Sequence, residues 1–357
     1  MGLHNGRSVL LISLLAFSLV LVACGATPPT EEAQVPPTQP PAAEVLPTEQ
    51  PPVRIAVFFT VLGNTFAKAV TDGVTEAADR LGGTVVTFGA DPAFDQVAQS
   101  NQIQDAIVSG NFDAFIIHPT DGNYIVPYVE QAVAAGIKVI DLDFVIGPDA
   151  RTYEPCCGMT AFVGRTGVDH GASLAKMAIM ACDTVVEKPC KVGYLSGVQA
   201  LTIDQDRIEA IEKALKEHPD IEMVAMQDAF YSEEKGYEVA QNILRAQPDI
   251  DVLFTSGDQM MLGAEQAVID SGLKGKILLM GNGCDSRGYQ AVKEGRWFAT
   301  FADLPYTIGQ RAAEIAIRAA RGEEVSSIVK TDEQKPPLPA DGPIITQENV
   351  DQFEPQW

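Results

Sequence analysis

From Arg54 onward, short runs rich in β-branched and aromatic residues alternate with longer segments whose apolar positions recur every three to four residues. The run RIAVFF (54–59) predicts a strand, and the segment after it predicts a helix that ends at Gly82. The helix is indicated by the spacing of Phe66, Val70, Val74, Ala77 and Leu81. Further strands are expected at 84–88, 113–119 and 138–144, with helices at 95–110 and 125–136.

A second series of the same kind begins at AFVG (161–164), with a different sequence. Its expected strands are 191–196, 221–227, 251–258, 276–283 and 296–305, and its expected helices are 171–181, 204–218, 232–247, 259–272, a segment ending at Glu294, and 307–322. Strands that alternate with helices indicate parallel sheets with right-handed crossovers. The pattern therefore predicts an α/β protein with two doubly wound parallel-sheet lobes, followed by a mostly irregular tail at 335–353.

The N-terminal segment has the features of a bacterial export signal. Arg7 precedes an apolar run at 8–23, which is short for a membrane span and stops sharply at LVAC. This stretch resembles the lipobox of bacterial lipoproteins, in which the cysteine is acylated. We therefore expect residues 1–23 to be a lipoprotein signal peptide and Cys24 to carry lipid; a signal peptide with an incidental cysteine is the alternative.

Residues 24–53 differ in composition from everything that follows. Nine prolines lie between Pro28 and Pro52, with Thr, Glu and Gln between them and no apolar periodicity. Such a segment is a semi-rigid tether that spans on the order of 80 Å if fully extended as polyproline II. A lipid anchor followed by a tether predicts a domain held at the extracytoplasmic face of the cell membrane.

The chain is strongly acidic, with 48 Asp and Glu against 25 Lys and Arg, a net charge of −23 at pH 7. The charges are interspersed and form no acidic tail, so they indicate a solvated surface. Such a field repels phosphate backbones, which argues against a nucleic-acid partner. The 357 residues suffice for two domains.

Six cysteines are present, and lipidation of Cys24 leaves five. Cys182 and Cys190 bracket a turn-like insert, and in an oxidising compartment we predict a disulfide between them. Cys156 and Cys157 are adjacent and are expected to be geometrically poor partners for each other, while Cys284 is unassigned. The chain has no C-x-x-C or H-x-x-x-H motif and its four histidines are far apart, so no metal site is expected.

Polar residues follow most of the expected strands. Ligands of open parallel sheets bind beyond the carboxyl ends of the strands. In KVIDLDF (138–144), Asp141 and Asp143 share a strand parity, and Asp143 lies nearer the expected cleft. We favour a ligand role for Asp143, and leave ligand binding and an internal structural role equally open for Asp141. The strand-end residues are Asn64, His118, Asp143, Gly197, Asp258, Asn282 and Asp303.

The chain lacks the sequence motifs of several classes of enzyme. The loop TVLGNTF after the first strand has one glycine and no G-x-G-x-x-G, so no dinucleotide cofactor is expected. The chain has neither a G-x-S-x-G nor a G-x-x-x-x-G-K-[ST] motif. His118 could be a general base, but a hydrogen-bonding role is favoured. A glycosidase would need a second carboxylate at a set distance from Asp143, which sequence alone does not place.

The order of motifs carries a resemblance. TVLGNTF, IIHPTDG, VIDLDF, FTSGDQMMLGA, GNGCDSRG and FATFADLP resemble, in this order, loops of the type I periplasmic sugar-binding proteins, and the likeness runs from Val53 to about Lys330. It implies two lobes joined by a three-crossing hinge that closes over one sugar. The implied division is 54–163 plus 304–331 for the N-terminal lobe and 164–303 plus 332–357 for the C-terminal lobe.

The resemblance also implies which residues bind ligand. Asn64 and Phe66 match the family's asparagine and stacking aromatic, Asp143 its hydroxyl-accepting aspartate, and Tyr231 a second aromatic position. The chain departs from the family pattern at several positions. Phe144 and Gln205 stand where the family has arginines, Ala67 replaces an aromatic residue, and His118 replaces an asparagine. Gly257 replaces the asparagine before Asp258, Asn282-Gly283 replaces an aromatic-aspartate pair, and Asp303 replaces the hinge glutamine. The full implied set is Asn64, Phe66, His118, Asp143, Phe144, Arg165, Gln205, Tyr231, Asp258, Asn282 and Asp303.

These observations predict a lipid-anchored solute-binding protein that passes a neutral monosaccharide or related polyol to an ABC permease. The loss of two arginines while acids remain argues against an anionic ligand. We expect no cofactor and a monomer. The alternatives are a sensory receptor of the same fold that docks to a membrane kinase or chemoreceptor, and a glycoside hydrolase.

Overall fold

The computed structural model describes residues 50–149, 151–334 and 337–357, and residues 50–357 form one compact unit. The expected signal peptide, the expected lipid on Cys24 and most of the tether lie outside the described residues. Among the residues that are described, no helix is both long and apolar enough to cross a bilayer.

The N-terminal lobe is built on a six-stranded sheet in the order β11-β5-β4-β3-β1-β2, in which all paired neighbours run parallel. Its strands are β1 (Val53–Phe59), β2 (Gly83–Gly89), β3 (Ala114–Ile117), β4 (Lys138–Asp143), β5 (Ala161–Gly164) and β11 (Ile328–Lys330). Its helices are α1 (Thr65–Leu81), α2 (Gln96–Ser109), α3 (Val126–Ala134) and α9 (Pro305–Ala320).

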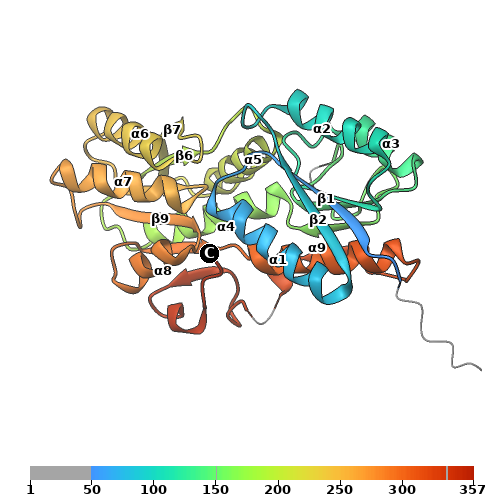
Figure 1. The fold of residues 1–357 in the computed structure, drawn as a ribbon. Helices are drawn as coiled ribbons and strands as arrows, with labels where there is room; N and C mark the ends of the chain where they lie inside the picture. The colour runs from blue at the N-terminus through green and yellow to red at the C-terminus, as the bar shows by residue number, and fades with distance from the viewer. Residues whose placement is uncertain (1–49, 150, 335–336) are drawn as a thin grey trace, which may run out of the picture. The chain divides into compact units, whose positions relative to one another are not determined.

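Both faces of this sheet are covered, which explains why its central strands are apolar without interruption. In β1, Ile55 and Val57 pack with α1 and α9, whereas Ala56 and Phe58 pack with α2 and α3. Helices α1 and α9 lie side by side (Figure 1). Their close approach requires glycine, because a Cβ on Gly73 would lie 2.1 Å from the carbonyl oxygen of Tyr306.

The C-terminal lobe repeats the architecture with the order β12-β10-β9-β8-β6-β7, parallel except for the antiparallel pair β10–β12. Its strands are β6 (Cys190–Ser196), β7 (Ile221–Asp228), β8 (Val252–Thr255), β9 (Leu278–Gly283), β10 (Ala299–Ala302) and β12 (Ile344–Thr346). Its helices are α4 (Gly167–Cys182), α5 (Thr202–Lys216), α6 (Glu233–Ala246), α7 (Asp258–Asp270) and α8 (Ser286–Lys293), and short 3₁₀ turns lie at η1 (Thr331–Glu333) and η2 (Val350–Gln352).

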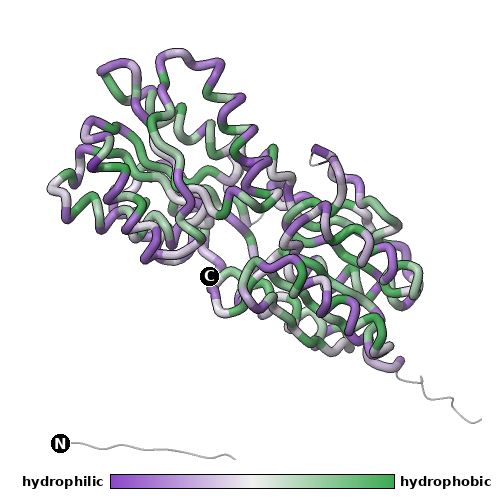
Figure 2. The backbone as a smooth tube through the Cα atoms, turned by 90° about the horizontal axis from the view of Figure 1, so that it is seen from above, coloured by the Kyte–Doolittle hydropathy of each residue, from purple (hydrophilic) through white to green (hydrophobic). Residues whose placement is uncertain are grey.

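The helices of the C-terminal lobe also cover both faces of their sheet. Tyr194 and Phe254 pack with α4 and α5, and Leu195 and Leu253 pack with α6 and α7. Figure 2 shows hydrophilic and hydrophobic stretches alternating along the outer helices, as expected of helices with one face on a core. The predicted α/β fold with two parallel sheets is confirmed.

The chain passes between the two sheets three times, after β5, after β10 and after β11. The prediction that the tail is mostly irregular missed β12, which pairs with β10 and completes the second sheet. No strand was predicted at β11, which precedes the tail and pairs with β5 at the edge of the first sheet. Both are three-residue strands, too short to give a periodic signal.

Two pairs of cysteines are joined. Cys182 at the end of α4 bonds to Cys190 at the start of β6, with 5.7 Å between their Cα atoms. Cys156 and Cys157, which the sequence led us to regard as poor partners, are joined to each other in the structure. The expectation was wrong for this loop, where Cys157 adopts a positive φ of 62°. Cys284 is a buried free thiol.

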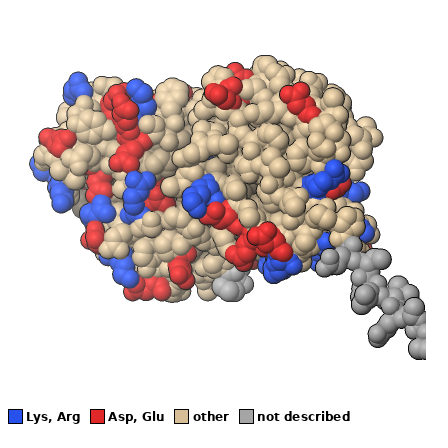
Figure 3. Space-filling view, viewed as in Figure 1, with Lys and Arg blue, Asp and Glu red and all other residues tan. Residues whose placement is uncertain are grey.

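The surface carries the acidic excess in dispersed form. Figure 3 shows Asp and Glu interleaved with Lys and Arg on the face drawn. Several of the contacts are exposed ion pairs, such as Arg54–Asp113 and Arg287–Glu233. Each pair of this kind contributes little to stability.

Candidate functional site

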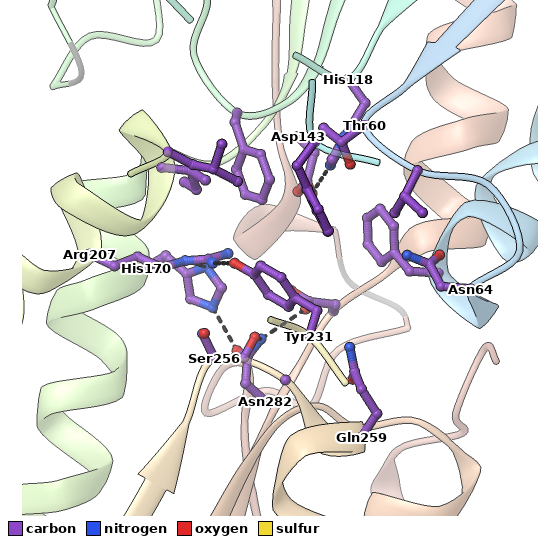
Figure 4. Close-up of a pocket in the computed structure, with 18 of the residues that line it drawn as sticks. Thr60, Asn64, His118, Asp143, His170, Arg207, Tyr231, Ser256, Gln259 and Asn282 are labelled. Carbon is purple, nitrogen blue, oxygen red and sulfur yellow. Dashed lines mark hydrogen bonds and ion pairs between the residues drawn. The ribbon is translucent and has the colours of Figure 1, made fainter. Parts of the chain in front are cut away.

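A pocket lies where the carboxyl ends of the strands of both sheets converge (Figure 4). The loops after β1, β2, β3 and β4 supply one wall, and α4, α5 and the loops after β7, β8, β9 and β10 supply the other. The polar and aromatic lining residues are Thr60, Asn64, Phe66, Phe94, His118, Asp143, Phe144, His170, Arg207, Tyr231, Ser256, Gln259, Asn282, Asp303 and Trp357.

The N-terminal lobe lines the pocket with aromatic rings and with several polar side chains between them. The His118 ring lies 5.7 Å from the Phe66 ring and 5.0 Å from the Phe144 ring, measured between centroids. Its Nε2 is 3.4 Å from Oδ2 of Asp143. Asn64 is fixed by its role as the N-cap of α1, since its Oδ1 accepts from the N–H of Ala67 at 2.7 Å.

Asp143 ends β4 in an unusual backbone conformation, with φ at 73°. A non-glycine residue in this region is uncommon and costs free energy that the surrounding structure must supply. The neighbouring strand accommodates it through Gly164, where a Cβ would lie 2.6 Å from the Cα of Asp143. This backbone directs the carboxylate of Asp143 into the pocket, as Figure 4 shows.

Asp141, two residues earlier, has a structural role instead. It is 1% exposed, and its Oδ2 accepts from the N–H of Ile146 at 2.7 Å, which holds the loop after β4. Burial, together with the nearby charge of Asp143, raises the pKa of Asp141 well above its ordinary value. Asp141 is therefore a buried group that holds this loop, and it does not line the pocket.

In the C-terminal lobe, Arg207 on α5 is the centre of a buried network. Its Nη1 donates to the Tyr231 hydroxyl at 2.8 Å and lies 3.2 Å from Oδ1 of Asp204. The Tyr231 hydroxyl in turn donates to Asp204 at 2.9 Å. Although burial opposes its charge, the pKa of Arg207 is raised because Tyr231 and Asp204 favour the cation. The guanidinium is neutralised within its own lobe.

His170 and Asn282 extend this network toward the second crossing. Arg207 Nε donates to Nδ1 of His170 at 3.1 Å, so the imidazole proton sits on Nε2, which is 2.6 Å from Oδ1 of Asn282. Burial and the charge of Arg207 hold the pKa of His170 well below its ordinary value, which keeps the ring neutral. The Asn282 amide then donates to the carbonyl of Ser256 at 3.0 Å and contacts Asp303 at 3.4 Å.

Asp303 lines the pocket and also contacts the segments in which the chain crosses between the lobes. Its Oδ1 is 3.1 Å from Nη1 of Arg165, and Nε of the same guanidinium is 3.4 Å from Asp332. The Arg165 side chain is 2% exposed and lies with its Cζ 4.3 Å from the centre of the Phe301 ring. Burial raises the pKa of Asp303 to about 6, against the opposing effect of Arg165. Asp303 is thus ionised at neutral pH and titrates just below it.

Side chains of the two lobes touch across the pocket. The Phe94 and Tyr231 rings stack at 6.1 Å, and Cζ of Arg207 lies 5.0 Å from the centre of the Phe144 ring. Beside the pocket, the N–H of Gly122 donates to the hydroxyl of Thr202 at 3.1 Å. Contacts of this kind define a closed arrangement of the lobes.

Eight of the eleven residues proposed from sequence line this pocket, and Arg165, Gln205 and Asp258 do not. Arg165 faces the crossings, as described above. The side-chain amide of Gln205 on α5 donates to the carbonyl of Ala200, in the loop that precedes this helix. Asp258 is fully buried under the sheet end, where it accepts from the Thr300 hydroxyl and the N–H of Asp285.

The pocket also contains residues that the sequence did not suggest. Thr60 and Ser256 follow strands directly and could have been found by the strand-end rule. His170 and Arg207 lie within helices, where that rule gives no signal, and Trp357 lies beyond the tail segment. Among the residues described, no group of three or more His, Cys, Asp or Glu is placed to hold a metal ion.

Two parallel-sheet lobes with a pocket between them are the architecture of a protein that binds a ligand between its lobes. Residues 55–324 match the family described as "Periplasmic binding protein domain", and the chain belongs to this family. The fold is that of the type I periplasmic binding proteins.

The chain is also similar to individual sugar-binding proteins of known name or structure. The ribose import binding protein RbsB of Salmonella typhimurium is 30% identical over 273 residues, 76% of this chain and 86% of that protein. The D-allose-binding periplasmic protein of Escherichia coli is 27% identical over 280 residues, covering 78% of this chain and 88% of that protein. An ABC transporter solute-binding protein from Actinobacillus succinogenes with bound D-allose superposes with a TM-score of 0.72 at 26% identity, covering 84% of this chain and 100% of that one.

Proposed function

We propose that this protein is an extracytoplasmic solute-binding protein that captures a neutral monosaccharide or related polyol between its lobes and delivers it to an ABC permease. The relatives named above are sugar-binding proteins, and the family implies an extracytoplasmic location. The proposal for this chain depends on the chemistry of its own pocket.

The observation that carries the proposal is that two carboxylates and several aromatic rings line the same pocket. Asp143 and Asp303 line the pocket from different parts of the fold, while the guanidinium of Arg207 is neutralised by Asp204. Carboxylates accept strong hydrogen bonds from hydroxyl groups. Phe66 and Phe144 offer apolar rings to the C–H faces of a sugar. An anionic ligand would meet two carboxylates with no free cation opposite them among the lining residues that are described.

A thermal-shift screen followed by calorimetry tests this function. The panel contains D-ribose, D-allose, L-arabinose, myo-inositol and glycerol, with D-glucuronate as the anionic control. A ligand at 100 times its Kd adds about 2.7 kcal/mol of stability. We expect at least one neutral cyclic compound to stabilise the protein and D-glucuronate to have no effect. Preference for the anion, or hydrolysis of a glycoside that Asp143→Asn abolishes, would contradict the proposal.

We further propose that Cys24 is lipid-modified after removal of residues 1–23 and that the monomeric binding domain is tethered to the membrane by residues 24–53. The support is the LVAC sequence and the proline-rich segment that follows it. Fractionation of cells that express the full chain should recover it with membranes, and Cys24→Ala should release it. If Cys24→Ala stays as firmly bound as the wild type, lipidation is the wrong explanation.

A further inference from the structure

The segment that follows η2 returns to the ligand pocket. Phe353 is buried in the core of the C-terminal lobe, and four residues later Trp357 lines the pocket. The C mark lies between the two halves of the molecule in both views (Figures 1 and 2). This segment is not one of the loops at the carboxyl ends of strands, which the sequence analysis predicted to line the pocket.

Trp357 is fixed to the C-terminal lobe by two hydrogen bonds. Its indole Nε1–H donates to the carbonyl of Gly283 at 3.1 Å, and its own carbonyl accepts from the N–H of Ser286 at 2.8 Å. Gly283 leaves the space that the indole occupies, since a Cβ there would lie 2.6 Å from Cζ2 of Trp357. The end of β9 and the start of α8 therefore form a seat for the indole.

The same segment also contacts the N-terminal lobe. The Trp357 ring meets the Phe66 ring edge to face at 5.6 Å between centroids. Gln356 donates to the hydroxyl of Thr307 at 2.7 Å and accepts from the N–H of the same residue at 3.1 Å, at the start of α9. Residues 356 and 357 are thus held by both lobes at the edge of the pocket.

We propose that Trp357 contacts the ligand and determines specificity for a cyclic sugar or polyol that has an apolar C–H face. The inference rests on the proposed function. The indole N–H is already paired with Gly283, so what the side chain offers to the pocket is apolar ring surface. Together with Phe66 it forms an aromatic corner, which favours a ring with a C–H face over a short open-chain polyol.

A different role for Trp357 would be that of a plug that fills the pocket until a ligand displaces it. The two roles predict opposite effects of removing the indole. A ligand-contacting indole lowers the affinity when it is removed, whereas removal of a plug raises it. Binding measurements on the same variants therefore separate them.

Intrinsic fluorescence can follow Trp357 directly. The chain has two tryptophans, and the other, Trp297, is 1% exposed and donates to Glu265 in the core of the C-terminal lobe. We expect the best ligand of the panel of D-ribose, D-allose, L-arabinose and myo-inositol to change the wild-type fluorescence. The change should be absent in Trp357→Phe, while calorimetry still detects binding to that variant.

Calorimetry on Trp357→Ala gives the second readout. We expect its Kd for that cyclic ligand to rise by about tenfold or more, equivalent to about 1.4 kcal/mol, and its melting temperature to stay near that of the wild type. The matched control is Glu354→Ala, an exposed position of the same segment, which should bind within twofold of the wild type.

Each contrary outcome has its own meaning. An unchanged Kd in Trp357→Ala, or tighter binding, overturns the role of Trp357 and leaves the proposed function intact. A fluorescence change that persists in Trp357→Phe overturns it as well. If no compound of the panel binds the wild type, the proposed function fails, and the inference fails with it.

Discussion

Asp141 and Asp143 differ in their surroundings far more than in their positions along the chain. Asp141 is buried and holds a loop through the N–H of Ile146, whereas Asp143 faces the pocket from a left-handed backbone position. The sequence shows two similar carboxylates on one strand. Only the conformation at the strand end directs one of them, Asp143, into the pocket.

The first prediction concerns the two carboxylates of the pocket. Asp143→Ala and Asp303→Ala should each weaken binding of the cognate sugar, because hydroxyl donors would be left unpaired in a closed site. The expected cost is about 1–3 kcal/mol per lost group, roughly one to two decades in Kd.

The control for this pair is Asp141→Asn, which preserves the shape of a buried side chain outside the lining. Calorimetry and melting curves on all three variants check the prediction. Binding of the two pocket variants within twofold of the wild type would show that these carboxylates do not contact the ligand hydroxyls.

The second prediction concerns pH. Under the proposed function, ionised Asp303 accepts hydrogen bonds from the sugar, and its pKa is raised to about 6. Affinity should therefore be constant above pH 7 and fall as the pH decreases through 6, and Asp303→Asn should lack this dependence. Calorimetry between pH 5 and 8 checks it, and an identical pH profile for both proteins would contradict it.

The effect of Asp303 on folding has the opposite sign. Because the folded-state pKa lies above the unfolded value of 3.8, the folded protein binds the additional proton between those values. Its contribution to stability is therefore greatest at acid pH and is lost as the pH rises through about 6. The melting temperature of the wild type relative to Asp303→Asn should increase on acidification from pH 7 to 5, while ligand affinity decreases.

At the scale of elements, the alternation of strands and helices was predictable because the sheets are buried on both faces and the helices have strong end signals. Asn64, Asp95 and Ser232 cap α1, α2 and α6 through their side chains, and Gly82 ends α1 in a left-handed conformation. Because the strands could be predicted, the residues at their carboxyl ends could be identified as most of the proposed pocket lining. His170, Arg207 and Trp357 could not be found this way, because their positions depend on how helices and the tail pack in three dimensions.

The third prediction concerns the link between α4 and β6. The Cys182–Cys190 disulfide closes a short loop, which restricts the unfolded chain. Its removal in a Cys182→Ala, Cys190→Ala double variant should lower the free energy of unfolding by roughly 2–3 kcal/mol. Denaturant melts under non-oxidising and oxidising conditions measure the difference.

The matched control is Cys156→Ala, Cys157→Ala. The Cys156–Cys157 bond joins sequence neighbours and closes almost no loop, so its loss should cost much less through chain entropy. Equal destabilisation by both double variants would refute the loop-closure explanation. Recovery of Cys182 and Cys190 as free thiols from oxidised protein would refute the pairing itself.

At the scale of the whole molecule, the pocket is complete only when the lobes are together. Phe94 meets Tyr231, and Arg207 meets Phe144, across the pocket. A ligand that contacts both walls favours this arrangement because it binds the closed form better than the open one.

The fourth prediction follows from this closure. In solution scattering, saturating ligand should reduce the radius of gyration of the wild type, and the hinge crossings are where the motion should be absorbed. Tyr231→Ala, which removes one of the contacts between the lobes, should require a higher ligand concentration for the same change. An unchanged profile with tightly bound ligand would contradict closure between the lobes.

Arg165 has a consequence for how this protein can change through evolution. One guanidinium, 2% exposed, joins a residue of the first crossing to Asp303 in the second and Asp332 in the third. Loss of one partner alone leaves the buried guanidinium less well compensated, which is unfavourable. Substitutions at the three positions are therefore expected to be accepted more readily together than singly. A lineage that exchanged Asp303 for a neutral side chain to suit a different sugar would be expected to alter Arg165 or its surroundings in the same step.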